Sequence, residues 1–173
     1  LVGMALAALP QTPVRRLVLN DAGPLITAAS LDRIGQYVGK VVPLPSIEAA
    51  EMLVRAVSAP FGPHSDAEWR FLTEHVVRPL PGGGVTFRYD PAIAVAFNAQ
   101  QPHTDIDLWP MYEAIRCPAL VLRGAESDLL TRATAQAMTE RGPRATLVEF
   151  PGVGHAPTLI HADQIAAVRQ FLG

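Results

Sequence analysis

Three short apolar runs alternate with longer stretches of helical periodicity along this chain. The runs cover residues 14–20, 119–123 and 146–150, and each ends in turn or polar residues. Short continuous apolar runs of this kind are typical of strands in a parallel sheet that is covered on both faces. Apolar residues recur at helical spacing between the second and third runs, and again at residues 162–172. This strand–helix order predicts an α/β fold with right-handed crossovers.

The middle of the chain carries a different pattern, in which helical signals dominate. Ser46 is expected to cap one helix, and the segment Ser65–Glu68 is a capping box ahead of another. A short alternating stretch at residues 85–89 follows three glycines and predicts a small hairpin or an edge strand. We therefore divide the chain into a core segment at residues 1–24, a helical insertion or lid at 25–110, and a second core segment at 111–173.

Residues 1–9 show a helical apolar pattern that ends at Pro10. Val2, Ala5, Leu6 and Leu9 would share a buried face, and no Ser, Thr, Asp or Asn precedes them to cap the helix. The uncapped start, together with three strands where sheets usually have about five, predicts that further strands precede Leu1. An exposed sheet edge left in this way would favour association with a partner.

Composition narrows the classes of protein to which the chain could belong. The sequence has 173 residues, of which 49% are hydrophobic, enough for one well-packed domain. No stretch approaches the roughly 20 apolar residues that span a membrane. A net charge of −2 gives no electrostatic reason to expect nucleic acid or a membrane surface as a partner. The single cysteine, Cys117, excludes an internal disulfide, and we expect a cytoplasmic location.

Two of the apolar runs end near candidate catalytic residues. His155 follows the run at 146–150 on a glycine-rich loop, and Asp128 follows the run at 119–123. The carboxyl ends of parallel strands meet at one edge of the sheet, where open α/β folds place their sites. There His155 could act as a general base, and Asp128 could orient its imidazole. The sequence therefore predicts a pair of His155 with an acid of the loop that follows residues 119–123, with Asp128 as the leading candidate and Glu126, two residues earlier, as its competitor.

A second carboxylate, Asp21, is the alternative acid. It ends the run at residues 14–20, just as Asp128 follows the run at 119–123. An Asx-type turn into Gly23 and Pro24 is the simpler interpretation of Asp21. Capping of the segment that starts at Leu129 is the corresponding structural interpretation of Asp128.

Four segments together carry a resemblance to a known family: Arg16–Pro24, Pro118–Gly124, Ser127–Asp128 and Gly152–Pro157. In this order, with a helical insertion between the first and second, they resemble the C-terminal part of the α/β-hydrolase fold family, lid included. The resemblance implies a mostly parallel sheet and a serine-type hydrolase acting on an ester or similar carbonyl of a small molecule, with no cofactor and no metal. The order of acid before histidine fits the same family.

The family's nucleophile motif, Gly-x-Ser-x-Gly, occurs nowhere in the chain. The resemblance implies that the nucleophile (Ser, Asp or Cys) and both oxyanion-hole donors precede Leu1. We therefore expect the chain alone to be inactive. The alternative is a non-catalytic ligand-binding or interaction module with the same fold, in which Asp128 and His155 have no chemical role.

Five aromatic residues are candidates for lining a substrate pocket under the lid. Aromatic residues at helical spacing more often belong to the core, so we expect only one or two of them to touch a ligand. The five are Phe61, Trp69, Tyr89, Phe97 and Trp109.

Overall fold

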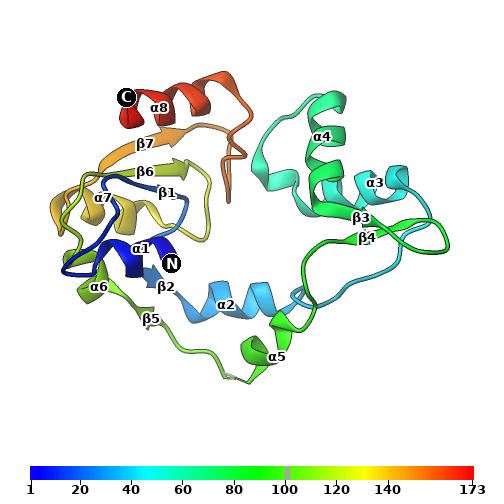
Figure 1. The fold of residues 1–173 in the computed structure, drawn as a ribbon, viewed down its shortest axis with the longest axis horizontal. Coiled ribbons are helices and arrows are strands. Elements are labelled where there is room, and N and C mark those ends of the chain that lie inside the picture. Colours follow the sequence, from blue (N-terminus) through cyan, green and yellow to red (C-terminus); the bar gives the residue numbers. More distant parts are fainter. Residues whose placement is uncertain (100–101) are drawn as a thin grey trace. The chain divides into compact units, whose positions relative to one another are not determined.

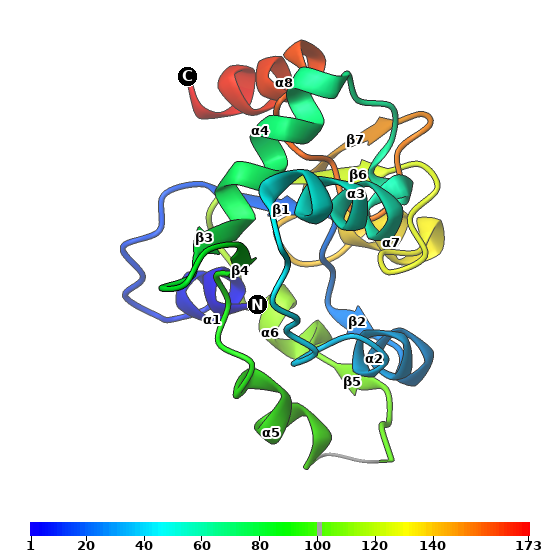
Figure 2. The ribbon, with the colours of Figure 1, turned by 90° about the vertical axis from the view of Figure 1, so that its right-hand side faces the viewer.

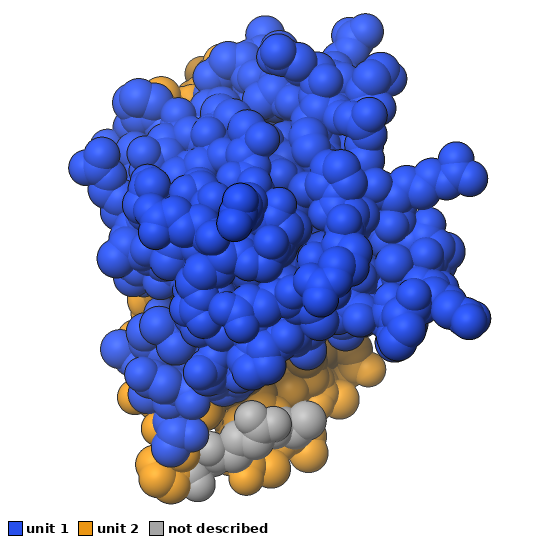
Figure 3. All heavy atoms as spheres, turned by 90° about the vertical axis from the view of Figure 1, so that its left-hand side faces the viewer, with its two compact units in different colours: residues 1–30, 60–62, 104–173 blue, residues 31–59, 63–103 orange. Residues whose placement is uncertain are grey.

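A computed structural model describes residues 1–99 and 102–173 of the chain. The chain forms two compact units, which Figure 3 distinguishes by colour. Unit 1 comprises residues 1–30, 60–62 and 104–173, and unit 2 comprises residues 31–59 and 63–103. Unit 2 falls inside the predicted insertion, but both ends of that insertion and the short segment 60–62 belong to unit 1.

The sheet of unit 1 has three parallel strands in the order β1-β6-β7. These strands are β1 (Leu17–Asn20), β6 (Ala119–Gly124) and β7 (Thr146–Phe150). In the register, Leu17 lies opposite Ala119, and Leu120 lies opposite Thr146. Every residue of β6 is buried, as expected for the central strand. All three predicted strands and their parallel arrangement are confirmed.

Helices cover both faces of this sheet (Figure 1 and Figure 2). Helices α1 (Val2–Ala7), α6 (Trp109–Glu113) and α7 (Arg132–Glu140) pack on one face, and α8 (Ala162–Leu172) packs on the other. Successive side chains of a strand point to opposite faces, so Val121 joins the core under α7 while Leu122 joins the core under α8.

The face of α1 that packs on the core differs from the predicted one. Met4 and Ala7 are buried, whereas Val2 and Leu6 are exposed, as is Leu9 beyond the end of the helix. The helix is apolar on several sides, so its spacing alone did not reveal which side the sheet would cover.

Two strands of two residues pair where the chain leaves unit 1 and where it returns. Strand β2 (Leu25–Ile26) pairs antiparallel with β5 (Ile106–Asp107). The Asp105 carboxylate accepts the N–H of Ala28 at 2.8 Å, at the start of α2 (Ala28–Gly35). These contacts explain why both ends of the predicted insertion belong to unit 1.

Unit 2 contains a helical pair and a β-hairpin. Helices α3 (Ile47–Val57) and α4 (Asp66–Val76) precede the antiparallel strands β3 (Val77–Pro79) and β4 (Val85–Phe87), and α5 (Ile93–Asn98) follows. The predicted Ser46 cap, the Ser65 capping box and the hairpin are all confirmed. Among the described helices of the chain, none combines the length and apolarity that crossing a bilayer requires.

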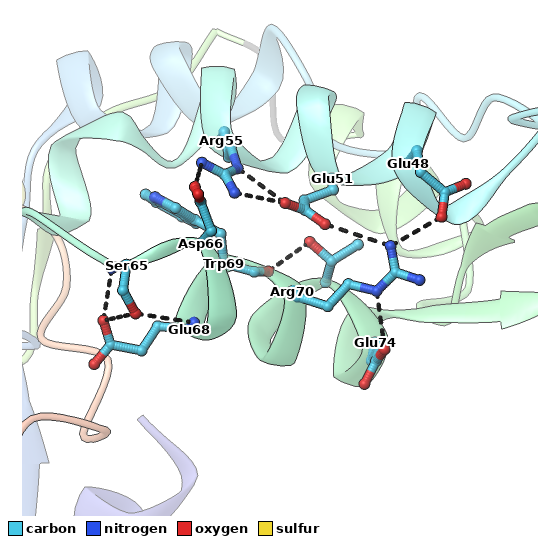
Figure 4. Close-up of polar contacts among 10 residues, drawn as sticks. Glu48, Glu51, Arg55, Ser65, Asp66, Glu68, Trp69, Arg70 and Glu74 are labelled. Atoms are coloured by element: carbon cyan, nitrogen blue, oxygen red, sulfur yellow. Dashed lines mark hydrogen bonds and ion pairs between the residues drawn. The ribbon is translucent and has the colours of Figure 1, made fainter.

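Ion pairs join α3 to α4 along one side of the helical pair (Figure 4). Arg55 pairs with Glu51 at 2.6 Å and with Asp66 at 2.7 Å, and Arg70 pairs with Glu48 at 3.0 Å. Hydrogen bonds to the carboxylates of Glu51 and Asp66 raise the pKa of the Arg55 guanidinium. Several of these side chains are well exposed, so each pair contributes little to stability on its own.

Candidate active site

The carboxyl ends of the three parallel strands place three polar side chains together. Asp21 comes directly after β1, Ser127 lies on the turn after β6, and His155 lies on the loop after β7. Because β6 lies between β1 and β7, the groups that follow the two outer strands meet across the end of the central one. This is the edge of the sheet at which the sequence predicted a site.

Asp21 is the centre of this arrangement and is completely buried. One carboxylate oxygen, Oδ1, accepts the N–H of Gly124 at 3.0 Å. The other, Oδ2, accepts the Ser127 hydroxyl at 2.5 Å and lies 2.7 Å from Nδ1 of His155. Three donors thus surround one carboxylate, which satisfies a buried negative charge. The backbone of Asp21 has a φ of 52°, in the left-handed region that Asp tolerates better than most residues.

His155 presents its two ring nitrogens to different surroundings. Nδ1 faces the Asp21 carboxylate, so the proton between them is on Nδ1 when that carboxylate is ionised. This leaves Nε2 for exchange with a reacting group, as in a general base. The side chain is 34% exposed, enough for a ligand to reach it.

Backbone and side-chain hydrogen bonds hold the loop that carries His155 at several points. The N–H of Glu126 donates to the carbonyl of Val153 at 2.9 Å, and the N–H of Gly154 donates to the carbonyl of Pro60 at 2.6 Å. On the other side of His155, the Asn20 amide donates to the carbonyl of Pro157 at 2.9 Å. Consecutive residues at the end of β1, Asn20 and Asp21, therefore both bind this loop.

Two glycines allow the loop to approach so closely. A Cβ atom added at Gly124 would lie 2.1 Å from the carbonyl oxygen of Gly154, and one added at Gly154 would lie 2.7 Å from the carbonyl oxygen of Pro60. No side chain fits at either position unless the backbone moves.

The structure places Asp21, the alternative acid of the sequence analysis, where that analysis expected Asp128. Asp128 is exposed on the turn after β6, and its neighbour Ser127 is the residue that faces inward. In the structure, the carboxylate that contacts Nδ1 of His155 is that of Asp21, and the catalytic role of either acid stays a prediction. The physical reason is the conformation of the turn, in which the Ser127 hydroxyl accepts the N–H groups of Leu129 and Leu130.

Comparisons with known proteins agree with this architecture. The profile of the alpha/beta hydrolase family matches residues 1–168. The chain belongs to the alpha/beta hydrolase family.

Individual relatives cover nearly all of the chain. A 3-hydroxybutyrate-oligomer hydrolase from Cupriavidus necator is 42% identical over 99% of the chain. Among solved structures, a protein from Rickettsia typhi has a TM-score of 0.88 at 33% identity over 99% of the chain. An alpha/beta hydrolase from Novosphingobium aromaticivorans has a TM-score of 0.86 at 35% identity over 98% of it. The chain spans 61%, 58% and 60% of these three proteins, respectively.

The nucleophile motif of the family is absent from the sequence, and Ser127, which lies beside Asp21 and His155, does not replace it. Ser127 is buried, and its hydroxyl donates to the Asp21 carboxylate and accepts two backbone N–H groups. A serine nucleophile has to donate its proton to the histidine and face the substrate. Ser127 meets neither condition.

Phe61, one of the five predicted pocket residues, is flanked in unit 1 by two residues that lie against the loop carrying His155. Its neighbour Pro60 accepts the Gly154 N–H, and a Cβ atom added at Gly62 would lie 3.0 Å from the carbonyl oxygen of Gly152. Both neighbours of Phe61 therefore lie against the loop that carries His155, although they are about 90 residues away in sequence.

Trp109 has contacts that favour a packing role instead of pocket lining. Its ring lies 3.7 Å from the guanidinium carbon of Arg141 and meets the ring of Tyr112 edge-on at 5.6 Å. Arg141 is the C-cap of α7, a helix about 14 Å long. Ser127 lies near the opposite, N-terminal end of this helix. Trp109 thus packs at the end of α7 that is remote from the site.

The remaining aromatic candidates belong to unit 2. Trp69 is 7% exposed and packs against His64, with 4.7 Å between ring centroids. Phe97 packs against His103 at the same distance, and Tyr89 is 41% exposed. Their part in a pocket stays a prediction. In the described part of the chain, no three His, Cys, Asp or Glu side chains gather in a way that could hold a metal ion.

Proposed function

We propose that Asp21 and His155 form the acid–base pair of a hydrolase that cleaves a carboxylic ester. The observation that carries this proposal is the 2.7 Å contact between Nδ1 of His155 and the buried Asp21 carboxylate, at the carboxyl ends of a parallel sheet. Family membership supports it, because the family orders its catalytic residues as nucleophile, acid and histidine.

The geometry gives each residue a defined role. Nε2 of His155 takes the proton of a nucleophile's hydroxyl as that oxygen attacks the ester carbonyl. The imidazolium that forms is stabilised by Asp21, and it then returns the proton to the leaving alcohol. Nε2 then deprotonates a water molecule, which attacks the acyl ester formed on the nucleophile, and the imidazolium returns the proton to the nucleophile's oxygen as the acid product leaves. The Gly-x-Ser-x-Gly motif is absent from residues 1–173, so the nucleophile has to come from outside them, and we expect these residues alone to show no turnover.

The proposed substrate is a small ester, and the name of the Cupriavidus necator relative points to short oligomers of a hydroxy acid. The predicted helical lid stays part of this proposal, and Phe61, which lies in unit 1, is the aromatic candidate proposed to supply apolar surface beside the site. A substrate of this kind needs no cofactor and no metal, and a cytoplasmic location would suit it.

The test uses the protein encoded by the whole reading frame in which this sequence occurs. Hydrolysis of p-nitrophenyl butyrate and of a 3-hydroxybutyrate dimer is measured for the wild type, His155→Gln and His75→Gln. His75 is exposed on α4 and serves as the matched control. We expect His155→Gln to lower kcat by about 10³-fold or more, and His75→Gln to leave it unchanged.

Two results would count against the proposal. Turnover that survives His155→Gln would exclude His155 as the base. A wild-type protein that binds the ester without hydrolysing it would favour the non-catalytic ligand-binding module instead.

A further inference from the structure

The hydroxyl group of Ser127 has all of its hydrogen-bonding capacity in use. Its oxygen accepts the N–H of Leu129 at 3.2 Å and the N–H of Leu130 at 3.1 Å. A hydroxyl has two acceptor positions and a single proton. Both acceptor positions are occupied, so the proton is left to point at Oδ2 of Asp21, 2.5 Å away.

This arrangement distinguishes Ser127 from an ordinary serine hydroxyl, which rotates to suit its surroundings. Here the two backbone N–H groups fix the rotation, and Ser127 cannot accept a proton from Asp21 in return. The donor is also buried, at 8% exposure, so water does not compete for the contact. The Asp21 oxygen that binds Ser127 is the same oxygen that binds His155.

The turn that carries Ser127 is held by the buried Arg123 side chain. Its guanidinium donates to the carbonyl oxygens of Ala125 at 3.0 Å, Ser127 at 3.3 Å and Leu130 at 2.8 Å. It also pairs with Glu149 of β7 at 2.7 Å. The position of the Ser127 hydroxyl is therefore fixed by the protein before any ligand binds.

We infer that Ser127 is a positioning residue that sets how strongly Asp21 holds and polarises the imidazole of His155. This inference rests on the proposed function and deepens it. The locked hydroxyl withdraws part of the carboxylate charge from Oδ2, which limits the attraction between Asp21 and the imidazolium. It also fixes the carboxylate in the plane that faces Nδ1.

Removal of the hydroxyl has two expected consequences. The Asp21 oxygen facing His155 carries more charge, so the imidazole is protonated at a higher pH than in the wild type. The carboxylate is also less firmly held, so the histidine is less well oriented. Charged groups at this end of the sheet include Arg123 with Glu149, and Glu126 and Asp128, which are exposed on the same turn. None of these is altered in the variants below.

The test compares Ser127→Ala, Ser127→Thr and Asp21→Asn in the whole protein. The titration midpoint of His155 is followed by NMR of the imidazole protons, with the resonance assigned by its loss in His155→Gln among the five histidines. We expect Ser127→Ala to raise the midpoint above that of the wild type, and to move the acid limb of the kcat/KM profile in the same direction. Ser127→Thr, which keeps the hydroxyl, should restore both.

A second measurement needs no substitution and so does not depend on the folding of a variant. The hydroxyl proton of Ser127 in the wild type should exchange slowly enough to give a resolved resonance, because its oxygen is buried and fully bonded. A rapidly exchanging hydroxyl would overturn the inference.

The outcomes separate this inference from the proposed function. If Asp21→Asn shifts the midpoint of His155 and Ser127→Ala does not, the acid–base pair stands and the role of Ser127 is refuted. If neither substitution shifts it, the pair itself is refuted. If Ser127→Ala and Ser127→Thr shift it equally, the effect comes from packing and the hydroxyl has no positioning role.

Discussion

Substitution of Gly124 by alanine tests whether the close approach of the His155 loop is required for the site. The added Cβ would lie 2.1 Å from the carbonyl oxygen of Gly154 and 2.5 Å from that of Val153. Both contacts are with backbone atoms, which cannot rotate away as a side chain would. To reach an ordinary contact of 3.4 Å, the loop has to retreat from Gly124 by about 1.3 Å.

A retreat of this size is large compared with the tolerance of the site. The Asp21–His155 contact is 2.7 Å, and an added 1 Å takes it beyond hydrogen-bonding distance. Misplacement by about 1 Å costs on the order of 10²-fold in rate, and overpacking of this kind costs about 1–3 kcal/mol of stability. We therefore expect Gly124→Ala to lower kcat/KM about 100-fold and to lower the free energy of unfolding measurably.

The assays are ester hydrolysis and urea unfolding of the same preparations. Gly82→Ala is the matched control, because a Cβ atom at Gly82 would meet nothing within 4 Å. Wild-type kcat/KM and wild-type stability in Gly124→Ala would refute the reasoning, since they would mean that the loop does not lie where the structure places it.

Three further predictions concern stability. Burial raises the pKa of Tyr112 to about 12, so the folded protein keeps a proton that the unfolded chain releases above about pH 10. The free energy of unfolding should therefore fall by about 2–3 kcal/mol between pH 10 and 12, a slope that Tyr112→Phe removes; parallel curves for the two proteins would contradict this. Ser65→Ala breaks the capping box of α4 and should destabilise unit 2 by about 1 kcal/mol in urea unfolding, whereas unchanged unfolding would show that the cap contributes nothing. Arg123→Lys removes the guanidinium that donates to three carbonyl oxygens and pairs with Glu149, so it should lower the free energy of unfolding by about 3 kcal/mol or more. A Tm equal to that of the wild type would exclude this role of Arg123.

The strands were predictable because a strand covered on both faces of the sheet is encoded by a short run of apolar residues. All residues of β6 are buried, and the segment is continuously apolar from Ala119 to Leu122, ahead of the buried Arg123. The first helix was less predictable, since Met4 and Val2 are equally apolar and only the position of the sheet decides which is covered. The return of Pro60 to the His155 loop left no signal, because the contact is made by a backbone carbonyl.

The candidate site was predictable in part. His155 follows a strand on a glycine-rich loop, and the structure places it beside Asp21 at the predicted edge of the sheet. The choice of acid depended on the conformation of the turn after β6, which directs Ser127 inward and leaves Asp128 exposed. Asp21, which lies beside His155 in the structure, directly follows a buried strand, but the same pattern fits a local turn. The roles of Ser127 and Asn20 could not be seen without the three-dimensional structure.

The most direct test of the account is the comparison of Asp21→Asn with Asp128→Asn in ester hydrolysis by the whole protein. Asparagine tolerates the left-handed backbone of residue 21 as well as aspartate does, so the substitution changes the acid without straining the chain. We predict that Asp21→Asn lowers kcat/KM by about 10³- to 10⁴-fold, while Asp128→Asn stays within a few-fold of the wild type. Loss of activity in Asp128→Asn with retention in Asp21→Asn would contradict the assignment of the acid.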